Sequence, residues 1–323
     1  MFMVKGADMK TLKKPIKKGF FYEIFKNRTL YIMTVPAIIF FTLLSYIPMI
    51  GIYYAFTRYN FKAGLFGSPF VGFKNFEFLF SGGFDSIIVR ITRNTVLYNL
   101  IFILIGNVLQ VMTAVVLSEL TSKLFKRISQ SLMFLPHFVS YVMVAVLAYN
   151  LFNFEYGLIN SLIRAAGIEA INFHGTPSIW WVIIPIIYFW KGMGYGMVIY
   201  LAAIMGIDRE MYEAADIDGA NIFKRIRHIT LPNLKPTFVI LLLFSLGSIL
   251  RGQFDLFYQL VGRNAMLFST TDIIDTYVYR SLTQNFDIGL GTAAGLYQSL
   301  FGMIMVLTVN YIVRKLNPEY ALF

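Results

Sequence analysis

The stretch EAADIDGANIFKRIRHITLP, from Glu213 to Pro232, is a polar, charge-balanced segment between two hydrophobic runs of the chain. Just before it, Asp208 is placed to cap a short helix, and Glu210 puts a negative charge in the first turn, where the helix dipole favours one. Gly219 suits the left-handed conformation that ends such a helix and reverses the chain. The stretch therefore predicts a short helix followed by a sharp turn.

A second, basic helix is expected after this turn, from about Asn221 to His228, and Pro232 and Pro236 are expected to stop it. Ala214 and Ala215 are small enough for the first helix to lie deep in a groove of another protein. A helix, a glycine turn and a second helix together favour a docking element. On composition alone, an ordinary solvated loop explains the segment equally well.

The segment resembles the EAA loop of ABC importer permeases, with every anchor of that pattern at its expected spacing: Glu213, Ala214, Ala215, Gly219, Ile229, Leu231 and Pro232. The resemblance implies that the loop forms coupling helices that dock into a cytoplasmic ATP-binding subunit. The residues that it assigns to this coupling are Glu213, Ala214, Ala215, Asp218, Gly219, Leu231 and Pro232. Beyond the amino-terminal tail, the rest of the chain resembles more loosely the carbohydrate-uptake branch, in particular permeases for oligosaccharides and polysaccharides.

The composition excludes an ordinary soluble domain. Of the 323 residues, 57% are hydrophobic and only 14% are charged, against about 25% charged in a typical soluble protein. Without cysteine, the chain forms neither disulfides nor thiolate metal sites. The net charge of +11 would suit nucleic acid, but much of it flanks apolar runs, which indicates membrane orientation and anionic headgroups instead.

Six apolar runs predict six transmembrane helices, because a helix needs about 20 apolar residues to cross the hydrocarbon core. The runs are 29–57, 94–118, 128–154, 180–204, 237–250 and 288–313. Pro136 and His137 interrupt the third run, and polar residues from Arg251 onward shorten the fifth. The predicted fold is an all-α membrane protein, which in the resembling family is the type I ABC importer permease fold.

The same runs divide the chain into a basic cytoplasmic tail (1–28), a six-helix permease domain (29–318) with a cytoplasmic coupling loop (205–236), and a C-terminal tail (319–323). Twice as many lysines and arginines lie on the side of the two termini as on the other side, so the positive-inside rule predicts that both termini are cytoplasmic. The aromatic segment 58–93 is then expected at the outer membrane interface, with a short surface helix over 84–93.

Several local features are expected within the spans. Pro36 and Pro48 should kink the first one, which neighbouring helices can tolerate. The pair Trp180–Trp181 is an expected interface anchor at the start of the fourth span. Gly192 and Gly196 have the spacing of small residues that allows close helix packing.

No motif for enzymatic chemistry is present. The sequence has no GxxxxGK[ST] phosphate loop, so this chain is not expected to bind ATP itself. His137, His174 and His228 are far apart and lack metal-ligand spacing, and no catalytic triad can be argued from their positions. No cofactor is therefore expected on this chain, and ATP and Mg²⁺ are expected in the partner ATPase subunits.

Polar residues inside the spans indicate the substrate path. A charge at membrane depth costs about 2.5–3.5 kcal/mol and usually faces a cavity or a partner, and broken helices expose backbone groups that ligands use. The predicted pathway residues are Tyr188, Lys191, Tyr195, Arg251, Gln253 and Asp255. Snorkelling of Lys191 or Arg251 to the outer interface, or a structural pair with Asp255, explains the same charges equally well.

The apolar runs predict a multi-pass membrane protein. The resemblance implies a permease subunit of the bacterial plasma membrane, one half of an ATP-driven import pathway for an oligosaccharide or polysaccharide fragment. The implied partners are a second similar permease, two ATP-binding subunits, an extracellular substrate-binding protein and membrane lipids, but no nucleic acid. An ABC permease for a non-sugar solute is one alternative, because the EAA loop does not name the substrate. An ion-coupled secondary transporter, with Lys191 and Asp255 as charge relays, is another, although it has no need of an ATPase docking loop.

Overall fold

The structure is a computed structural model that describes residues 22, 26–80, 83, 86–316 and 318. Within these residues the elements are helical, and one isolated antiparallel bridge joins Thr57 to Phe70. Met1–Ile52 and Tyr53–Phe323 form two compact units, each considered by itself. Most of the predicted basic tail, and all of the predicted C-terminal tail (319–323), lie outside the described residues.

The first unit is a helical run with changing backbone geometry: α2 (Arg28–Phe41), the π turn η1 (Thr42–Tyr46) and the 3-10 stretch η2 (Ile47–Phe56), which continues into the second unit. Together they form a candidate membrane span. The N–H of Ile47 donates to the carbonyl of Thr42, directly before Pro48. The wider turn therefore lies where the proline ring disrupts regular α-helical bonding, whereas Pro36 lies inside α2.

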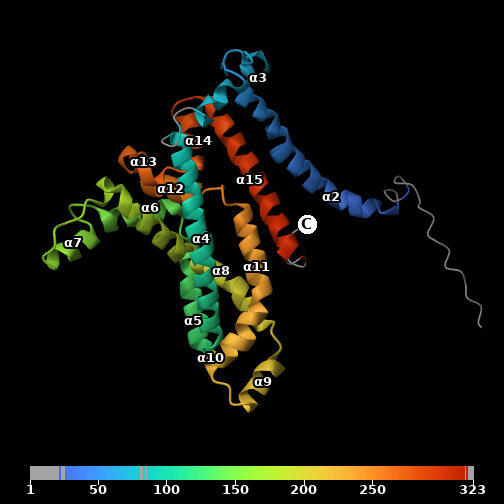
Figure 1. Cartoon of the computed structure of the whole chain (residues 1–323), viewed down its shortest axis with the longest axis vertical. Helices are drawn as coiled ribbons and strands as arrows, with labels where there is room; N and C mark the ends of the chain where they lie inside the picture. Colours follow the sequence, from blue (N-terminus) through green and yellow to red (C-terminus); the bar gives the residue numbers. More distant parts are fainter. Residues whose placement is uncertain (1–21, 23–25, 81–82, 84–85, 317, 319–323) are drawn as a thin grey trace, which may run out of the picture. The chain divides into compact units, whose positions relative to one another are not determined.

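The second unit is built on two long helices that pack against each other, α4 (Ile87–Ser118) and α8 (Trp180–Met205) (Figure 1). At one end Tyr98 and Phe102 of α4 share a buried cluster with Ile184 of α8. At the other end the buried cluster is formed by Ala114, Val115, Leu117, Met197, Tyr200, Leu201, Ile204 and Leu234. The apolar residues of the two predicted spans thus form the core of this unit.

The prediction of a short surface helix over 84–93 is wrong for the described part of this segment, because the long helix α4 already starts at Ile87. Ser86 caps it, its hydroxyl accepting a hydrogen bond from the N–H of Val89. Ile88 and Ile91 are buried in the core, so the charged residues near them occupy only the other side of the same helix. The prediction missed the periodic apolar face of this helix because charged residues lie between its buried positions in the sequence.

The third predicted span is broken at the expected place. α5 (Lys123–Phe134) leads through η5 (Leu135–Phe138) to α6 (Tyr141–Phe152), and the two halves are bent by 95°. α6 then leaves the direction of α4 and α5 (Figure 1). Pro136 lies at this break. Proline has no backbone N–H, and in the first turn of η5 this missing donor disrupts no regular helical hydrogen bond.

The remaining long helices are α11 (Leu231–Gly247) and α15 (Ile288–Leu316). The shorter elements are α3 (Gly64–Gly67), η3 (Gly72–Leu79), α7 (Leu158–Ala165), η6 (Phe173–Gly175), η7 (Pro177–Ile179), α9 (Arg209–Ile217), α10 (Ile222–Arg225), η8 (Ile226–Thr230), α12 (Phe254–Val261), η9 (Ala265–Leu267), α13 (Phe268–Thr271) and α14 (Ile274–Thr283). In the described part of the chain, five helical runs are long and apolar enough to span a membrane, or six if the bent pair counts as one. This agrees with the six predicted spans.

The tryptophan pair is not an interface anchor. Trp180 is 1% exposed, and its indole Nε1 donates a 2.8 Å hydrogen bond to the carbonyl of Phe173. The ring of Trp181 stacks on Tyr98 at a centroid distance of 4.3 Å. Both rings therefore hold α8 against its neighbours, because the large apolar ring and its single N–H are satisfied inside the protein.

Close packing along α8 is also shifted from its predicted position. A Cβ at Gly192 would meet nothing, whereas one at Gly194 would overlap the carbonyl of Met133 and one at Gly196 the side chain of Gln110. The small-residue contact thus involves Gly194 and Gly196, which bring α5 and α4 close to α8.

Candidate functional site

The first helix of the predicted coupling loop forms as expected. α9 begins after Asp208, whose carboxylate accepts a 3.0 Å hydrogen bond from the N–H of Glu210. The chain reverses at Gly219, which has φ +69°, and the N–H of Gly219 donates to the carbonyl of Asp216. The following N–H, of Ala220, donates to the carbonyl of Ala215. These bonds satisfy carbonyls at the helix end in a conformation that glycine adopts at little cost.

The second helix does not stop at Pro232 as predicted. α10 continues through the π turn η8 into α11, and the N–H of Leu231 donates to the carbonyl of Ile226. Pro232 occupies the first turn of α11, where a missing N–H is tolerated, and Pro236 lies inside that helix. As at Pro48, a widened turn precedes the proline, and the helical run Ile222–Gly247 is one candidate span.

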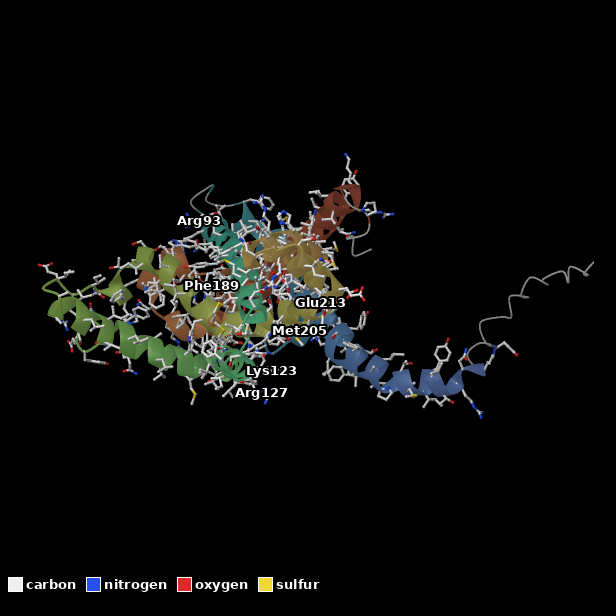
Figure 2. The ribbon with its side chains drawn as sticks, turned by 90° about the horizontal axis from the view of Figure 1, so that it is seen from below. Arg93, Lys123, Arg127, Phe189, Met205 and Glu213 are labelled. Carbon is white, nitrogen blue, oxygen red and sulfur yellow. The ribbon has the colours of Figure 1, made fainter. Side chains whose placement is uncertain are left out.

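The outer surface of the loop is exposed and partly apolar. Figure 2 views this end of the molecule, with Glu213 directed into solvent. Ile217 and Phe223, on either side of the glycine turn, are 88% and 77% exposed. Neither residue was predicted as functional. The signal in the sequence that could have identified them is that they are apolar residues in a polar segment. Ile217 ends α9 and Phe223 belongs to α10, so each of the two helices that meet at the turn has an exposed apolar side chain.

The other predicted coupling residues occupy the ends of elements. Ala214 is exposed and Ala215 half-buried on α9, and Asp218 is the C-cap residue of that helix. Leu231 and Pro232 are exposed at the start of α11. The structure thus places these residues on one loop, with the α9 members and the start of α11 on opposite sides of the turn.

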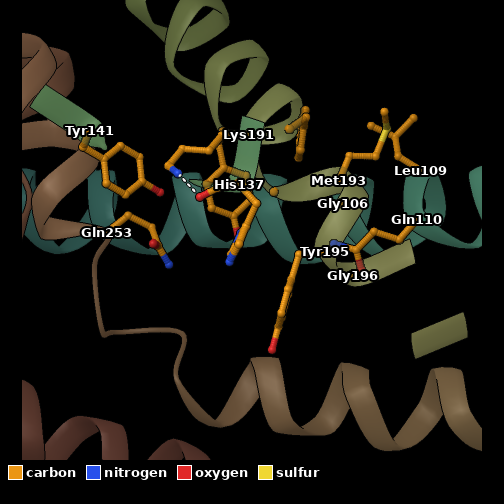
Figure 3. A pocket seen from close by; sticks show the side chains of 13 residues that line it. Gly106, Leu109, Gln110, His137, Tyr141, Lys191, Met193, Tyr195, Gly196 and Gln253 are labelled. Atoms are coloured by element: carbon orange, nitrogen blue, oxygen red, sulfur yellow. Dashed lines mark hydrogen bonds between the residues drawn. The ribbon is translucent and has the colours of Figure 1, made fainter. Parts of the chain in front are cut away.

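A cavity of about 280 Å³ lies between α4, η5 and α8, next to the amino-terminal ends of α6 and α12 (Figure 3). It brings together four of the predicted pathway residues: Tyr188, Lys191, Tyr195 and Gln253. Three lining residues with polar side chains were not predicted: Gln110, His137 and Tyr141. Gln110 lies in the middle of an apolar run, and a position facing a cavity cannot be told from one facing a partner helix by sequence alone.

Lys191 does not snorkel to the surface. The residue is 8% exposed, and its ammonium group donates to the carbonyl of His137 at 2.7 Å (Figure 3). It also donates to the carbonyl of Pro136 at 3.4 Å. The same group lies 4.9 Å from the ring centroid of Tyr141. Carbonyl oxygens and a ring face together stabilise a cation that is largely removed from water. The cavity therefore has a fixed positive charge in its wall.

Aromatic rings supply the flat part of the wall. Tyr195 stacks on His137 at 4.6 Å and is still 53% exposed, so part of its surface is accessible. Tyr188 stacks on Phe102 at 3.9 Å. Trp190, by contrast, lines a separate apolar groove between α6 and α8. The cavity thus combines aromatic side chains with amide and ammonium donors, an arrangement that suits an uncharged or acidic polyhydroxylated ligand.

Gln253 reaches the cavity because the break after α11 is pinned from two sides. The N–H of Gly252 donates to the carboxylate of Asp275 at 2.7 Å, and the amide of Gln298 donates to the same oxygen and to the carbonyl of Leu250. Within the described residues Arg251 and Asp255 are exposed, do not line this cavity and form no ion pair with each other. Both predicted pathway assignments, and the predicted structural pair, therefore lack support from the geometry.

These features define a polytopic membrane protein with a polar cavity in its helical core and an exposed helical loop at one end. A family model described as "Binding-protein-dependent transport system inner membrane component" matches residues 103–318, and the chain belongs to this family. It is a multi-pass permease subunit of an ABC importer, as the loop pattern predicted.

Relatives of known name cover almost the whole chain. It is 34% identical over 314 residues to the polygalacturonan/rhamnogalacturonan transport system permease protein YteP of Bacillus subtilis, covering 97% of this chain and 96% of that one. It is 26% identical to the arabinooligosaccharides transport system permease protein AraP of the same organism, covering 98% of each. The named relatives are thus mostly carbohydrate permeases.

Two solved structures share the fold. A chain in the crystal structure of a bacterial ABC transporter involved in the import of the acidic polysaccharide alginate has a TM-score of 0.82 and 31% identity, covering 92% of this chain and 99% of that one. A chain of the bacterial alginate ABC transporter in complex with an alginate pentasaccharide-bound periplasmic protein has a TM-score of 0.81, 31% identity and coverage of 92% and 98%. The predicted permease fold is confirmed.

Proposed function

We propose that this chain forms half of the translocation pathway of an ATP-driven importer for an acidic oligosaccharide, with α9 docking into a cytoplasmic ATP-binding subunit. The observation that carries the proposal is the cavity at Lys191, where a fixed cation, stacked tyrosines and an amide converge. The partners are a second permease, two ATPase subunits that bind ATP and Mg²⁺, and an extracellular binding protein that delivers the saccharide. Both termini and α9 then lie in the cytoplasm.

The charge of the cavity supports an acidic rather than a neutral saccharide. In the described part of the wall Lys191 is the only ammonium or guanidinium group, and no carboxylate lines the cavity. A uronate-type carboxylate would thus meet a positive charge, with no carboxylate in the lining itself, in a partly desolvated site. One structural neighbour belongs to an importer of the acidic polysaccharide alginate, and one relative is named for polygalacturonan/rhamnogalacturonan transport, which agrees with this charge.

The exposed tip of the coupling loop supports ATPase docking. Ala214 leaves α9 thin on its outer face, while Ile217 and Phe223 offer apolar surface to a groove. Burial of these two side chains would stabilise the complex by a few kcal/mol, at about 1.5–3 kcal/mol for each large apolar side chain. Movement of the ATPase subunits would then be passed to the helices around the cavity, so that it opens alternately outward and inward.

Co-purification tests the docking step. Ala214→Trp should clash in the groove, so the ATPase subunit should no longer co-purify although the permease still inserts. Arg209→Trp at the start of α9 gives a comparison at a second exposed position.

Thiol labelling in the cysteine-free chain tests the orientation. Cysteines at Lys123 and Asn221 should react only from the cytoplasm, and those at Gly67 and Glu169 only from outside. Normal co-purification of Ala214→Trp, or external labelling at Asn221, would refute the proposal.

The ion-coupled alternative finds no support in the site. Its two charge relays form no ion pair among the described residues, and Lys191 is buried in the cavity wall whereas Asp255 is exposed and does not line the cavity. A chain of the binding-protein-dependent family also carries the docking loop that an ion-coupled carrier does not need. If the substrate is a non-sugar solute, neither saccharide should accumulate in an uptake experiment.

A further inference from the structure

Arg225, the last residue of α10, joins three elements of the chain. Its Nη1 lies 2.7 Å from Oδ1 of Asp216 on α9, and its Nη2 lies 3.2 Å from Oε2 of Glu119, the C-cap residue of α4. The side chains of Arg225 and Glu119 are only 25% and 17% exposed. One planar guanidinium thus holds two carboxylates in a fixed geometry, which a lysine could not do. We call these three residues the Arg225 clamp.

Glu119 is attached to the helix that forms one wall of the cavity. Gly106, Leu109 and Gln110 of α4 line the cavity, and the side chain of Gln110 lies directly against Gly196 of α8. Glu119 follows Gln110 by nine residues, or about 14 Å of helix at 1.5 Å per residue. The helix is continuous between them, so a displacement at Glu119 moves the cavity wall as well.

The last turns of α4 are also firmly packed. Val115 and Leu117 belong to the buried cluster that includes Tyr200 of α8 and Leu234 of α11. A densely packed cluster transmits displacement rather than absorbing it. The clamp therefore acts on a rigid part of the molecule, not on a free helix end.

A second contact of α9 stays within the coupling loop and does not extend to α4. The hydroxyl of Tyr212 lies 3.0 Å from that of Thr230, which ties α9 to η8 in the same loop. Among the hydrogen bonds and ion pairs of the described residues, the Arg225 clamp is the one that connects α9 through α10 to α4. The two arms of the clamp differ accordingly: the Asp216 arm holds the loop together, and the Glu119 arm joins the loop to the cavity wall.

We propose that Arg225 is a positioning residue that transmits the movement of the coupling helix α9 to α4, and so to the cavity. This inference rests on the proposed function, because it takes α9 as the helix that docks into the ATPase subunit. When the docked subunit displaces α9, Asp216 moves Arg225, and Arg225 moves Glu119. Loss of the Glu119 arm should leave docking intact but disconnect it from the cavity.

The test uses the complete complex in proteoliposomes, with binding protein and saccharide. Three quantities are measured for each variant: ATPase co-purification, stimulation of ATP hydrolysis by the loaded binding protein, and saccharide imported per ATP hydrolysed. Glu119→Gln removes the ion pair of the arm to α4, Arg225→Met removes both arms of the clamp, and the double variant completes a thermodynamic cycle. Lys123→Met is the matched control, because it removes an exposed charge four residues from Glu119 without touching the clamp.

The expected result is unchanged co-purification with a stimulation about fivefold lower in Glu119→Gln, the low end of the coupling usual between two sites. The double variant should be no worse than Arg225→Met, because Arg225→Met has already removed the contact that Glu119→Gln weakens, and Lys123→Met should behave like the unaltered chain. Saccharide imported per ATP should fall in parallel, which a merely stabilising contact would not cause.

A reversible tether provides the rescue. In the cysteine-free chain, Asp216→Cys together with Glu119→Cys should lose coupling, regain it when a bifunctional thiol reagent bridges the two positions through reducible disulfides, and lose it again on reduction. Wild-type stimulation in Glu119→Gln, additive losses in the double variant, or loss of ATPase co-purification in Glu119→Gln would each overturn the proposal. Failure of the docking proposal itself is distinguished by Ala214→Trp, which tests α9 without altering the clamp.

Discussion

The ammonium group of Lys191 donates a 2.7 Å hydrogen bond to the carbonyl of His137, the residue after the proline that breaks the third span. The break turns the chain by 95° and presents this carbonyl to α8 instead of keeping it within a helix. A cation from α8 therefore stabilises the bend, and the bend in turn holds the cation in the wall of the cavity. One contact thus joins the shape of the third span to the charge of the site.

Replacing Lys191 by Met should remove the charge while keeping the length of the side chain. We expect the apparent affinity for an acidic oligosaccharide to fall about tenfold, the equivalent of one charge-assisted hydrogen bond, with a much smaller change for a neutral one. Concentration dependence of uptake measures both. Lys62→Met, an exposed lysine outside the cavity, is the control; equal losses for both substrates would show that Lys191 acts only on the fold.

Adding one methyl group to α8 should distinguish two neighbouring glycines. A Cβ at Gly194 would overlap the carbonyl of Met133, whereas a Cβ at Gly192 would meet nothing. We expect Gly194→Ala to destabilise the purified complex by about 1–3 kcal/mol or more, as overpacking does, and Gly192→Ala to leave it within about 0.5 kcal/mol. Thermal unfolding in detergent measures the difference; equal unfolding temperatures would contradict the close contact between α5 and α8.

The comparison of these glycines shows what sequence can and cannot predict here. Hydrophobic runs gave the long helices, because lipid requires about 20 apolar residues in a span whatever the partners. The EAA spacing likewise gave α9 and the turn at Gly219, which depend on local backbone chemistry. Which glycine of KGMGYG meets another helix depends instead on the rotation of α8, which is fixed by residues far away in the sequence.

The other differences between the predictions and the structure also depend on the surroundings of each residue in the fold. Trp180 and Trp181 have the composition of an interface anchor, but their positions in the core depend on Phe173 and Tyr98, which lie on other elements. Pro232 is a helix breaker locally, yet a preceding π turn accommodates it. Four of the seven lining residues with polar side chains were predicted, because polar residues in or next to apolar spans attract attention in the sequence. Gln110, His137 and Tyr141 were missed, because their role depends on their neighbours in space.

Gly219 should tolerate asparagine but not valine. Its φ of +69° lies in the left-handed region, where a Cβ would find open space but the backbone itself is strained. We expect Gly219→Val to cost about 1–2 kcal/mol or more in the folded loop and to weaken ATPase co-purification, while Gly219→Asn, a residue that visits this region more readily, keeps most of it. Normal co-purification of Gly219→Val would argue against a tight turn as the basis of docking.

His174 should make the stability of the complex sensitive to acid. Burial lowers the pKa of His174 below its ordinary value, and among the described atoms its Nε2 is buried without a hydrogen-bond partner. The folded state thus favours the neutral ring, so its contribution to stability is present above the unfolded pKa of about 6.5 and is lost as the pH falls through the lower folded pKa.

On acidification from about pH 7.5 to about pH 5, the unfolding temperature of the unaltered complex should therefore fall further than that of His174→Phe, which keeps ring contacts but cannot be protonated. His228→Gln serves as control, because His228 is exposed on the coupling loop and should leave the acid sensitivity unchanged. An identical pH profile for His174→Phe and the unaltered complex would contradict the assignment of the effect to His174.

The most direct test of the central claim is uptake by the reconstituted complex of an acidic oligosaccharide and a neutral one of the same length, each presented on its binding protein. We expect ATP-dependent accumulation that favours the acidic saccharide, and a loss of that accumulation in Tyr188→Ala, Tyr195→Ala and Gln253→Ala although these variants still assemble. Accumulation of neither saccharide, or unchanged accumulation in all three variants, would contradict the claim that this cavity carries the substrate.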